Sequence, residues 1–138
     1  MSAFVIDASV AVGIVSPDER NEMISSLLDR VIDHGAFAPS LWLLETANAL
    51  RFKWAKPEGA ASLAREAVEK LHALPIELVD IEPAVVRGGV LTLAYRHRLT
   101  IYDASYLHLA MILSLPLATF DRNLAKAASK EAVDVLAA

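Results

Sequence analysis

Four carboxylates occupy positions where a folded core would favour an apolar side chain. Two of them directly follow short apolar runs, one interrupts a leucine-rich helical run, and one lies within the segment 100–105. If the fold brings them together, they form an all-oxygen pocket, which suits a hard divalent cation and the handling of phosphates. A metal-dependent nuclease is therefore the leading hypothesis. The four residues are Asp7, Glu45, Asp103 and Asp121.

Helix capping offers a simple structural explanation for the three aspartates. An aspartate at the start of a helix accepts backbone hydrogen bonds and contributes about 1 kcal/mol. We predict that Asp7, Asp103 and Asp121 each precede or open a helix, so capping explains each one, taken singly, as well as metal binding does. The two roles are compatible, because a carboxylate has two oxygens.

Glu45 is harder to explain as a purely structural residue. On a helical wheel it shares one face with Leu41, Asn48 and Phe52, while apolar residues crowd the opposite face. A helix that is apolar on most sides is expected to be buried, and a glutamate within it must be paired or bound to a metal. The alternative is a buried ion pair with an Arg or Lys that the sequence does not identify.

Polar neighbours accompany the acids. Ser9 and Thr119 each lie two residues from an aspartate of the set, and Asn48 lies one helical turn beyond Glu45. Their side chains could orient a carboxylate or a water molecule, as the supporting groups around metal ligands do. Capping and turn formation explain the two hydroxyls equally well. The four histidines are scattered without metal-binding spacing, and we interpret them as structural or surface residues.

The length and composition predict one globular domain, residues 1–138. An apolar share of 55% and a charged share of 22% exclude disordered and fibrous classes, and part of the apolar surface is expected to face a protein partner. Cysteine is absent, which excludes disulfides, thiolate zinc sites and cysteine nucleophiles. No run approaches the roughly 20 apolar residues of a membrane span, and no secretory signal is visible, so we expect a cytoplasmic protein.

The net charge of -4 argues against a protein that coats nucleic acid through bulk electrostatics. This argument is weak for a metalloenzyme, because the ligand carboxylates are counted and the bound cations are not. Two local basic clusters exist, and solvated helix faces explain them better than phosphate contacts do. They are Arg51, Lys53 and Lys56 in one segment, and Arg96, His97 and Arg98 in another.

Short apolar runs alternate with longer stretches that have helical spacing. The runs predict strands over 3–6, 36–38, 76–81, 116–120 and 132–136. Strands that alternate with helices favour a parallel sheet covered on both faces, and ligands of such sheets bind beyond the carboxyl ends of the strands. Asp7 and Asp121 both lie at predicted strand ends, so the expected fold places them on the binding edge.

Start and stop signals divide the helical stretches. Ser16 and Pro17 predict the beginning of one helix, and Gly35 predicts its end. We expect Ser40 to cap a second helix that runs to about residue 55. The residues expected to open the following helices are Pro57, Pro83 and Asp103.

Each of the four acids lies in a segment with a distinctive pattern. The segments are 5–11 (VIDASVA), 38–50 (APSLWLLETANAL), 99–110 (LTIYDASYLHLA) and 117–124 (LATFDRNL). In this order, and with the E-x-x-N and T-x-D-x-x-L spacings of the second and fourth, they resemble the motifs of the PIN domain family, specifically of the VapC-type ribonuclease toxins. One departure is visible at Gly13-Ile14, where many relatives carry Lys-Trp, so no basic residue is expected near the cleft at this position.

The resemblance implies an α/β fold, a PIN-domain-like three-layer sandwich with a five-stranded parallel sheet and helices on both faces. It implies an endoribonuclease that depends on Mg²⁺, with Mn²⁺ as a substitute, and hydrolyses RNA with a metal-activated water. It also implies a homodimer and a cognate antitoxin protein that covers the active-site groove. The catalytic residues and metal ligands that it implies are Asp7, Glu45, Asp103 and Asp121.

Two alternatives stand beside the nuclease hypothesis. The first is a catalytically inert PIN-like scaffold that binds RNA or protein, although the presence of all four acids argues against it. The second is phosphoryl transfer through an aspartyl-phosphate, which Asp7 at a strand end permits, but the D-x-D-x-T pattern of one such class is missing. The dinucleotide, P-loop, serine-hydrolase and zinc-protease motifs are also absent from the sequence.

Overall fold

The structure, a computed structural model, describes residues 3–56 and 59–137. A five-stranded parallel sheet forms its central layer. The strands lie in the order β3-β2-β1-β4-β5, and every adjacent pair is parallel. Their bounds are Phe4–Ile6 (β1), Ala36–Pro39 (β2), Ile76–Val79 (β3), Leu117–Ala118 (β4) and Val135–Leu136 (β5). All five predicted strands are confirmed within a few residues.

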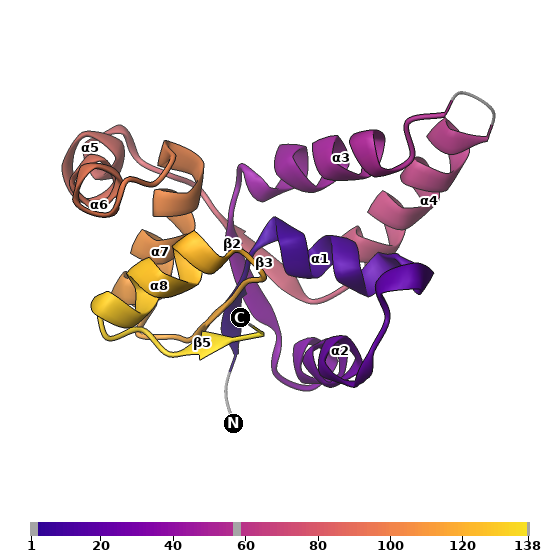
Figure 1. Cartoon of the computed structure of the whole chain (residues 1–138), viewed down its shortest axis with the longest axis horizontal. Coiled ribbons are helices and arrows are strands. Elements are labelled where there is room, and N and C mark those ends of the chain that lie inside the picture. The colour runs from indigo at the N-terminus through magenta and orange to yellow at the C-terminus, as the bar shows by residue number, and fades with distance from the viewer. Residues whose placement is uncertain (1–2, 57–58, 138) are drawn as a thin grey trace.

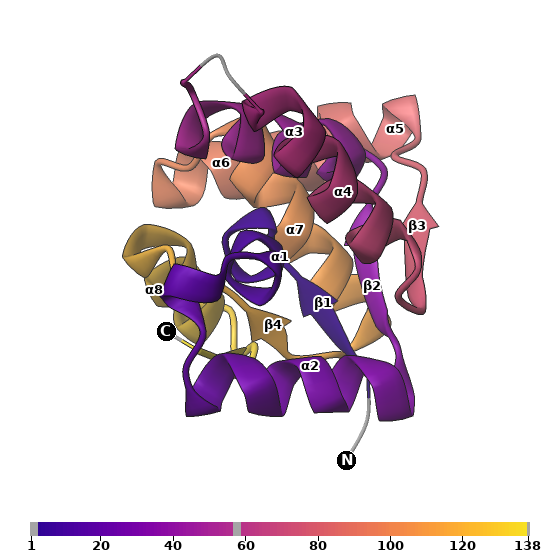
Figure 2. The ribbon, with the colours of Figure 1, turned by 90° about the vertical axis from the view of Figure 1, so that its right-hand side faces the viewer.

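Helices cover both faces of the sheet, as Figures 1 and 2 show. Helices α1 to α4 lie on one side and α5 to α8 on the other, so the predicted three-layer α/β sandwich is confirmed. The bounds are Ala8–Val15 (α1), Glu22–His34 (α2), Trp42–Lys53 (α3), Ala60–His72 (α4), Pro83–Val85 (α5), Leu91–His97 (α6), Ile101–Leu113 (α7) and Arg122–Lys130 (α8). A 3₁₀ turn, Pro17–Glu19, precedes α2, and a π-helical segment, Val86–Val90, joins α5 to α6.

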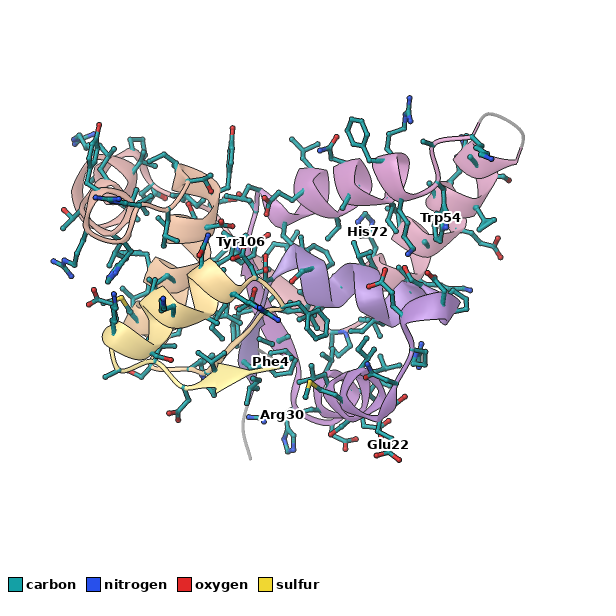
Figure 3. All side chains as sticks on the ribbon, viewed as in Figure 1. Phe4, Glu22, Arg30, Trp54, His72 and Tyr106 are labelled. Carbon is teal, nitrogen blue, oxygen red and sulfur yellow. The ribbon has the colours of Figure 1, made fainter. Side chains whose placement is uncertain are left out.

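The centre of the sheet is the driest part of the molecule. All three residues of β1 are fully buried, because helices pack on both of its faces. The guanidinium carbon of Arg30 lies 5.6 Å from the centroid of the Phe4 ring, at the end of β1 remote from its carboxyl terminus (Figure 3). Within the described residues, no helix is both long and apolar enough to cross a bilayer.

The strand order reverses at β1, and this reversal prepares a binding edge. The chain runs outward from β1 through β2 to β3, then crosses to the other side of β1 to form β4 and β5. Ligand sites of open parallel sheets form at such a switch point, beyond the carboxyl ends of the two strands that flank it. Here these ends are those of β1 and β4, which lead directly into Asp7 and the segment 119–121.

The expected helix starts at Ser16-Pro17 and at Ser40 are both corrected. Helix α2 begins at Glu22 rather than near Pro17, because Arg20 is extended and Asn21 accepts a hydrogen bond from the Ile24 amide as N-cap. The side chain of Ser40 makes no capping bond, since α3 begins after Leu41. Pro83 opens a helix and Gly35 ends one, as predicted, whereas Pro57 lies outside the described residues.

Helix α3 is also more exposed than its apolar composition suggested. It packs against α1 and α4 through Trp42, Thr46 and Leu50, and much of its remaining surface is exposed or only partly buried. Leu44 and Phe52 are 78% and 69% exposed. The prediction of a helix buried on most sides is therefore wrong, and the apolar excess of α3 forms an open surface instead.

Candidate metal centre of four carboxylates

Four different elements carry the four acids to the carboxyl edge of the sheet. Asp7 follows β1 and is the N-cap of α1, where its Oδ1 accepts a hydrogen bond from the Ala8 amide at 2.7 Å. Asp121 follows β4 and caps α8, where its Oδ1 accepts from two backbone amides. Glu45 lies in the first turn of α3 and Asp103 in the first turn of α7.

Asp103 lies in its helix rather than at the cap. Thr100 is the N-cap of α7, and its hydroxyl accepts a hydrogen bond from the Asp103 amide at 3.0 Å. The expectation that Asp103 opens this helix is therefore wrong, because the cap lies three residues earlier. As a consequence, capping does not explain the presence of an acid at this position, unlike at Asp7 and Asp121.

Two hydroxyls hold the buried carboxylate of Asp7. Its Oδ2 accepts hydrogen bonds from Thr119 Oγ1 at 2.6 Å and from Ser9 Oγ at 2.9 Å. Each hydroxyl also accepts a backbone amide from the segment after β4: Asp121 N–H bonds to Thr119, and Phe120 N–H bonds to Ser9. The two hydroxyls therefore join the ends of β1 and β4, and the sequence-predicted neighbours Ser9 and Thr119 both contact Asp7.

Burial dominates the electrostatics of Asp7. Desolvation raises the pKa of this carboxyl, and the hydrogen bonds from Thr119, Ser9 and Ala8 offset part of the rise, while the nearby charge of Asp121 adds to it. None of the four acids forms an ion pair with a Lys, Arg or His within the described residues. Burial of a carboxylate without a cation costs free energy. The described side chains do not supply the positive charge that would normally offset this cost.

The charges of the other three acids all act on the pKa of Asp103. Its pKa is raised to about 6, first by burial and then by the charges of Asp7, Asp121 and Glu45, while the Thr100 hydroxyl lowers it. An interaction with all three places Asp103 at the middle of the group. The same four carboxylates that the sequence singled out thus act on one another through space, although they come from positions up to 114 residues apart, from 7 to 121.

Tyr106 is a member of this site that the sequence analysis missed. Desolvation raises the pKa of Glu45, the Tyr106 hydroxyl lowers it, and the charge of Asp7 raises it again. Burial, and then Glu45, raise the pKa of Tyr106, which remains a neutral phenol. Tyr106 lies on α7 near the middle of the molecule (Figure 3). Its one available signal was its place one helical turn after Asp103, on the same helix face.

The donor set fits a hard cation, although the side chains do not yet converge on one point. Within the described residues, no group of three or more His, Cys, Asp or Glu side chains has the arrangement of a ready metal centre. However, the buried Oε1 of Glu45 and the Tyr106 hydroxyl lack a hydrogen-bond partner of acceptable geometry there. An unpaired carboxylate oxygen beside three further carboxylates is the environment that an oxygen-seeking divalent ion would satisfy.

A groove of about 720 Å³ extends from Glu45 along the outer face of α3. Leu41, Leu44 and Ala47 supply apolar walls, and Tyr102, one residue before Asp103, closes the side nearest α7. Asn48 lies exposed in this groove and makes no hydrogen bond to Glu45 within the described residues. Glu45 therefore opens onto a partly apolar surface.

The fold and these acids define the class of protein. The chain matches the family model of the PIN domain over residues 4–130 and belongs to that family. Two solved structures share the fold. PAE2754 from Pyrobaculum aerophilum matches at a TM-score of 0.69 and 24% identity, over 91% of this chain and 84% of that one. FitAcB from Neisseria gonorrhoeae matches at a TM-score of 0.68 and 21% identity, over 96% of each chain.

Two curated relatives extend the match to sequence. Ribonuclease VapC1 of Mycobacterium tuberculosis is 34% identical over 128 residues, which cover 92% of each chain. Ribonuclease VapC3 of Pyrobaculum aerophilum is 30% identical over 129 residues, which cover 88% of this chain and 92% of the relative. The resemblance to VapC-type PIN proteins is therefore confirmed.

Removal of the Thr119 hydroxyl should destabilise the protein. Thr119→Val deprives Asp7 of a buried donor and leaves the Asp121 amide unpaired, so we expect a loss of about 1–3 kcal/mol in the free energy of unfolding. Thr119→Ser keeps the hydroxyl and loses only a methyl, at about 0.8 kcal/mol. Urea denaturation of the two variants beside the wild type measures both. A serine variant less stable than the valine variant would contradict this role.

The raised pKa of Asp103 predicts a pH-dependent mutant effect. The folded-state pKa of about 6 lies above the ordinary value of 3.8, so ionisation of Asp103 costs stability above pH 6. This cost decreases as the pH falls from about 6 to 3.8, where the carboxyl becomes protonated in both states. With chelator present, Asp103→Asn should stabilise the protein at pH 7.5 by about 1 kcal/mol, after allowance for solvent screening. Near pH 4 the gain should vanish.

Thermal unfolding of wild type and variant at both pH values tests this expectation. Asp29→Asn, which removes an exposed acid from the distant helix α2, is the matched control and should not change the difference between the two pH values. A gain from Asp103→Asn that is equally large at pH 4 would show that the ionisation of Asp103 is not its cause.

Proposed function

We propose that this protein is a metal-dependent endoribonuclease and the toxin component of a toxin–antitoxin pair. The observation that carries the proposal is the set of four carboxylates at the switch point of the sheet, without a cationic side chain among them in the described residues; the pKa values of Asp7, Glu45 and Asp103 are raised. The relatives named ribonuclease VapC support the same activity. Within this proposal the whole chain, residues 1–138, acts as one domain.

Asp7, Glu45, Asp103 and Asp121 are the proposed ligands of Mg²⁺, for which Mn²⁺ would substitute. A bound divalent cation would supply positive charge to the phosphoryl oxygens and make water a stronger nucleophile. Asp7 is held rigidly by three hydrogen bonds and serves as the fixed ligand. Asp103, with its pKa of about 6, must lose its proton before it can act as a ligand, so binding of the ion should strengthen as the pH rises through this value.

The supporting residues fix the positions of the ligands. Ser9 and Thr119 hold Asp7 and couple it to the backbone around Asp121. Tyr106 is a neutral phenol beside Glu45, where it can donate a hydrogen bond to the carboxylate once the side chains adjust. Asn48 is exposed in the groove beside Glu45, a place suited to contact with substrate rather than to support of a ligand.

The open apolar surface of α3 suits a protein partner. Leu44, which lines the groove at Glu45, and Phe52, further along α3, are both largely exposed. An exposed apolar patch of this kind is characteristic of an interaction site. A cognate antitoxin seated there would cover the acids and block access of RNA. We propose this partner, together with a homodimeric state and a cytoplasmic location, from the VapC-type family membership.

The inert-scaffold alternative predicts the same fold without chemistry. It does not account for a buried acid such as Asp7 that lacks a cation, because a scaffold gains nothing from the cost of its burial. The aspartyl-phosphate alternative requires a nucleophilic carboxylate open to phosphate. The Oδ2 of Asp7 accepts two hydroxyls and its Oδ1 a backbone amide, which favours a role as ligand over one as nucleophile.

Cleavage of a mixed pool of structured RNA tests the proposal. Wild-type protein with Mn²⁺ should cut the RNA, and chelator should abolish cleavage. Asp103→Asn, purified identically, should reduce the rate by at least about 100-fold, because the variant lacks the charge of one proposed ligand, and even loss of a residue that only supports a ligand costs about 10–100-fold. Asp29→Asn is the control for the preparation. Equal cleavage by wild type and Asp103→Asn would assign the activity to a contaminant and contradict the proposal.

A further inference from the structure

A second charged surface lies beside the acids, and the function discussed so far does not use it. The helix ends at 96–98 and the outer side of α8 together line a hollow of about 370 Å³. We call this the basic hollow. Its polar lining consists of Arg96, His97, Arg98, Asn123, Lys126 and Lys130. No acidic side chain within the described residues lines it, although the chain as a whole carries a charge of -4.

The sequence showed only half of this surface. The cluster at 96–98 looks like an ordinary basic helix end, and the lysines of α8 lie about 30 residues further along. The fold places α8 beside this end of α6 (Figure 1), and Glu131, which directly follows α8, bonds to it. Its Oε2 accepts from Arg96 Nη1 at 2.7 Å and lies 2.6 Å from His97 Nε2.

Glu131 leaves most of the positive charge of the hollow unneutralised. It pairs with Arg96 and His97, whereas Arg98, Lys126 and Lys130 are exposed and form no ion pair within the described residues. The other basic cluster differs in this respect, because Lys53 is bound to both Asp18 and Glu19. Three unpaired cations around one concave surface form a site for an anion with several oxygens.

Both walls of the basic hollow lead to the candidate metal centre. Asn123 lies two residues after Asp121 on α8, and Lys126 and Lys130 follow on successive turns, about 10 Å of helix from Asn123 to Lys130. Arg98, on the other wall, ends α6 five residues before Asp103. A strand whose reacting phosphate lies at the acids can therefore place a neighbouring backbone phosphate in the hollow.

We propose that the basic hollow binds a backbone phosphate of the RNA strand close to the bond that is cut. This inference rests on the proposed function and assigns the substrate contact to Arg98, Lys126 and Lys130. The acids repel RNA when no cation is bound, so a separate cationic contact is needed to hold the strand at the site. The contact is to the backbone and should therefore contribute affinity without sequence preference.

Binding of a fluorescein-labelled single-stranded RNA, measured by anisotropy with chelator present, separates this contact from cleavage. Lys126→Gln with Lys130→Gln should weaken binding at least about fivefold and lower the slope of log Kd against log salt by about 1. The matched control is Arg65→Gln with Lys70→Gln, which removes the same charge from α4 on the other side of the sheet. An equal loss in the control would overturn the proposal, because overall charge would then explain it.

Two further measurements keep the outcomes distinct. A labelled polyglutamate peptide should bind more weakly than RNA. Equally tight binding that the lysine double variant also loses would overturn the assignment to RNA and favour an acidic protein segment. Metal-dependent cleavage by wild type is measured in parallel, so an inactive wild type whose RNA binding still depends on the two lysines would contradict the nuclease while supporting the hollow. Melting temperatures confirm that both double variants are folded.

Discussion

The desolvated carboxylate of Asp7 is the constraint on which the rest of the site depends. It lies at the carboxyl end of β1, whose three residues are fully buried, and receives three hydrogen bonds but no cation within the described residues. Its negative charge raises the pKa of Glu45 and Asp103, and the charge of Asp121 raises the pKa of Asp7 in turn. The protein thus concentrates negative charge in a dry place, which is favourable only if a cation completes the site.

The topology explains why these particular acids meet. A parallel sheet whose order reverses at β1 leaves its first and fourth strands to end side by side, so the residues after them share one edge. The first turns of α3 and α7 complete the edge from its two flanks. Thr119 and Ser9 lock the arrangement, because each hydroxyl bonds to Asp7 and to the backbone that follows β4.

Much of this could be predicted from the sequence, because strands and strand ends are local features. The runs 3–6 and 116–120 end at acids, and the alternation of strands with helical stretches favours a parallel sheet. Features that depend on packing between distant segments were missed. A helical wheel could not show that Leu44 and Phe52 face outward. The place of Tyr106 one turn after Asp103 indicated a shared helix face, but not that Tyr106 would lie beside Glu45 of another helix. Likewise, Lys126 and Arg98 join one hollow only after α8 folds beside α6.

The central claim is that the four carboxylates act as one group that holds a divalent cation. Isothermal titration of the metal-free protein with Mn²⁺, for wild type and for Asp7→Asn, Glu45→Gln, Asp103→Asn and Asp121→Asn, tests it most directly. The account predicts one saturable site in wild type that weakens in every variant, with a proton released on binding near pH 6 because Asp103 must ionise. Folded wild type that binds no Mn²⁺, or variants that bind it as tightly as wild type, would contradict the account.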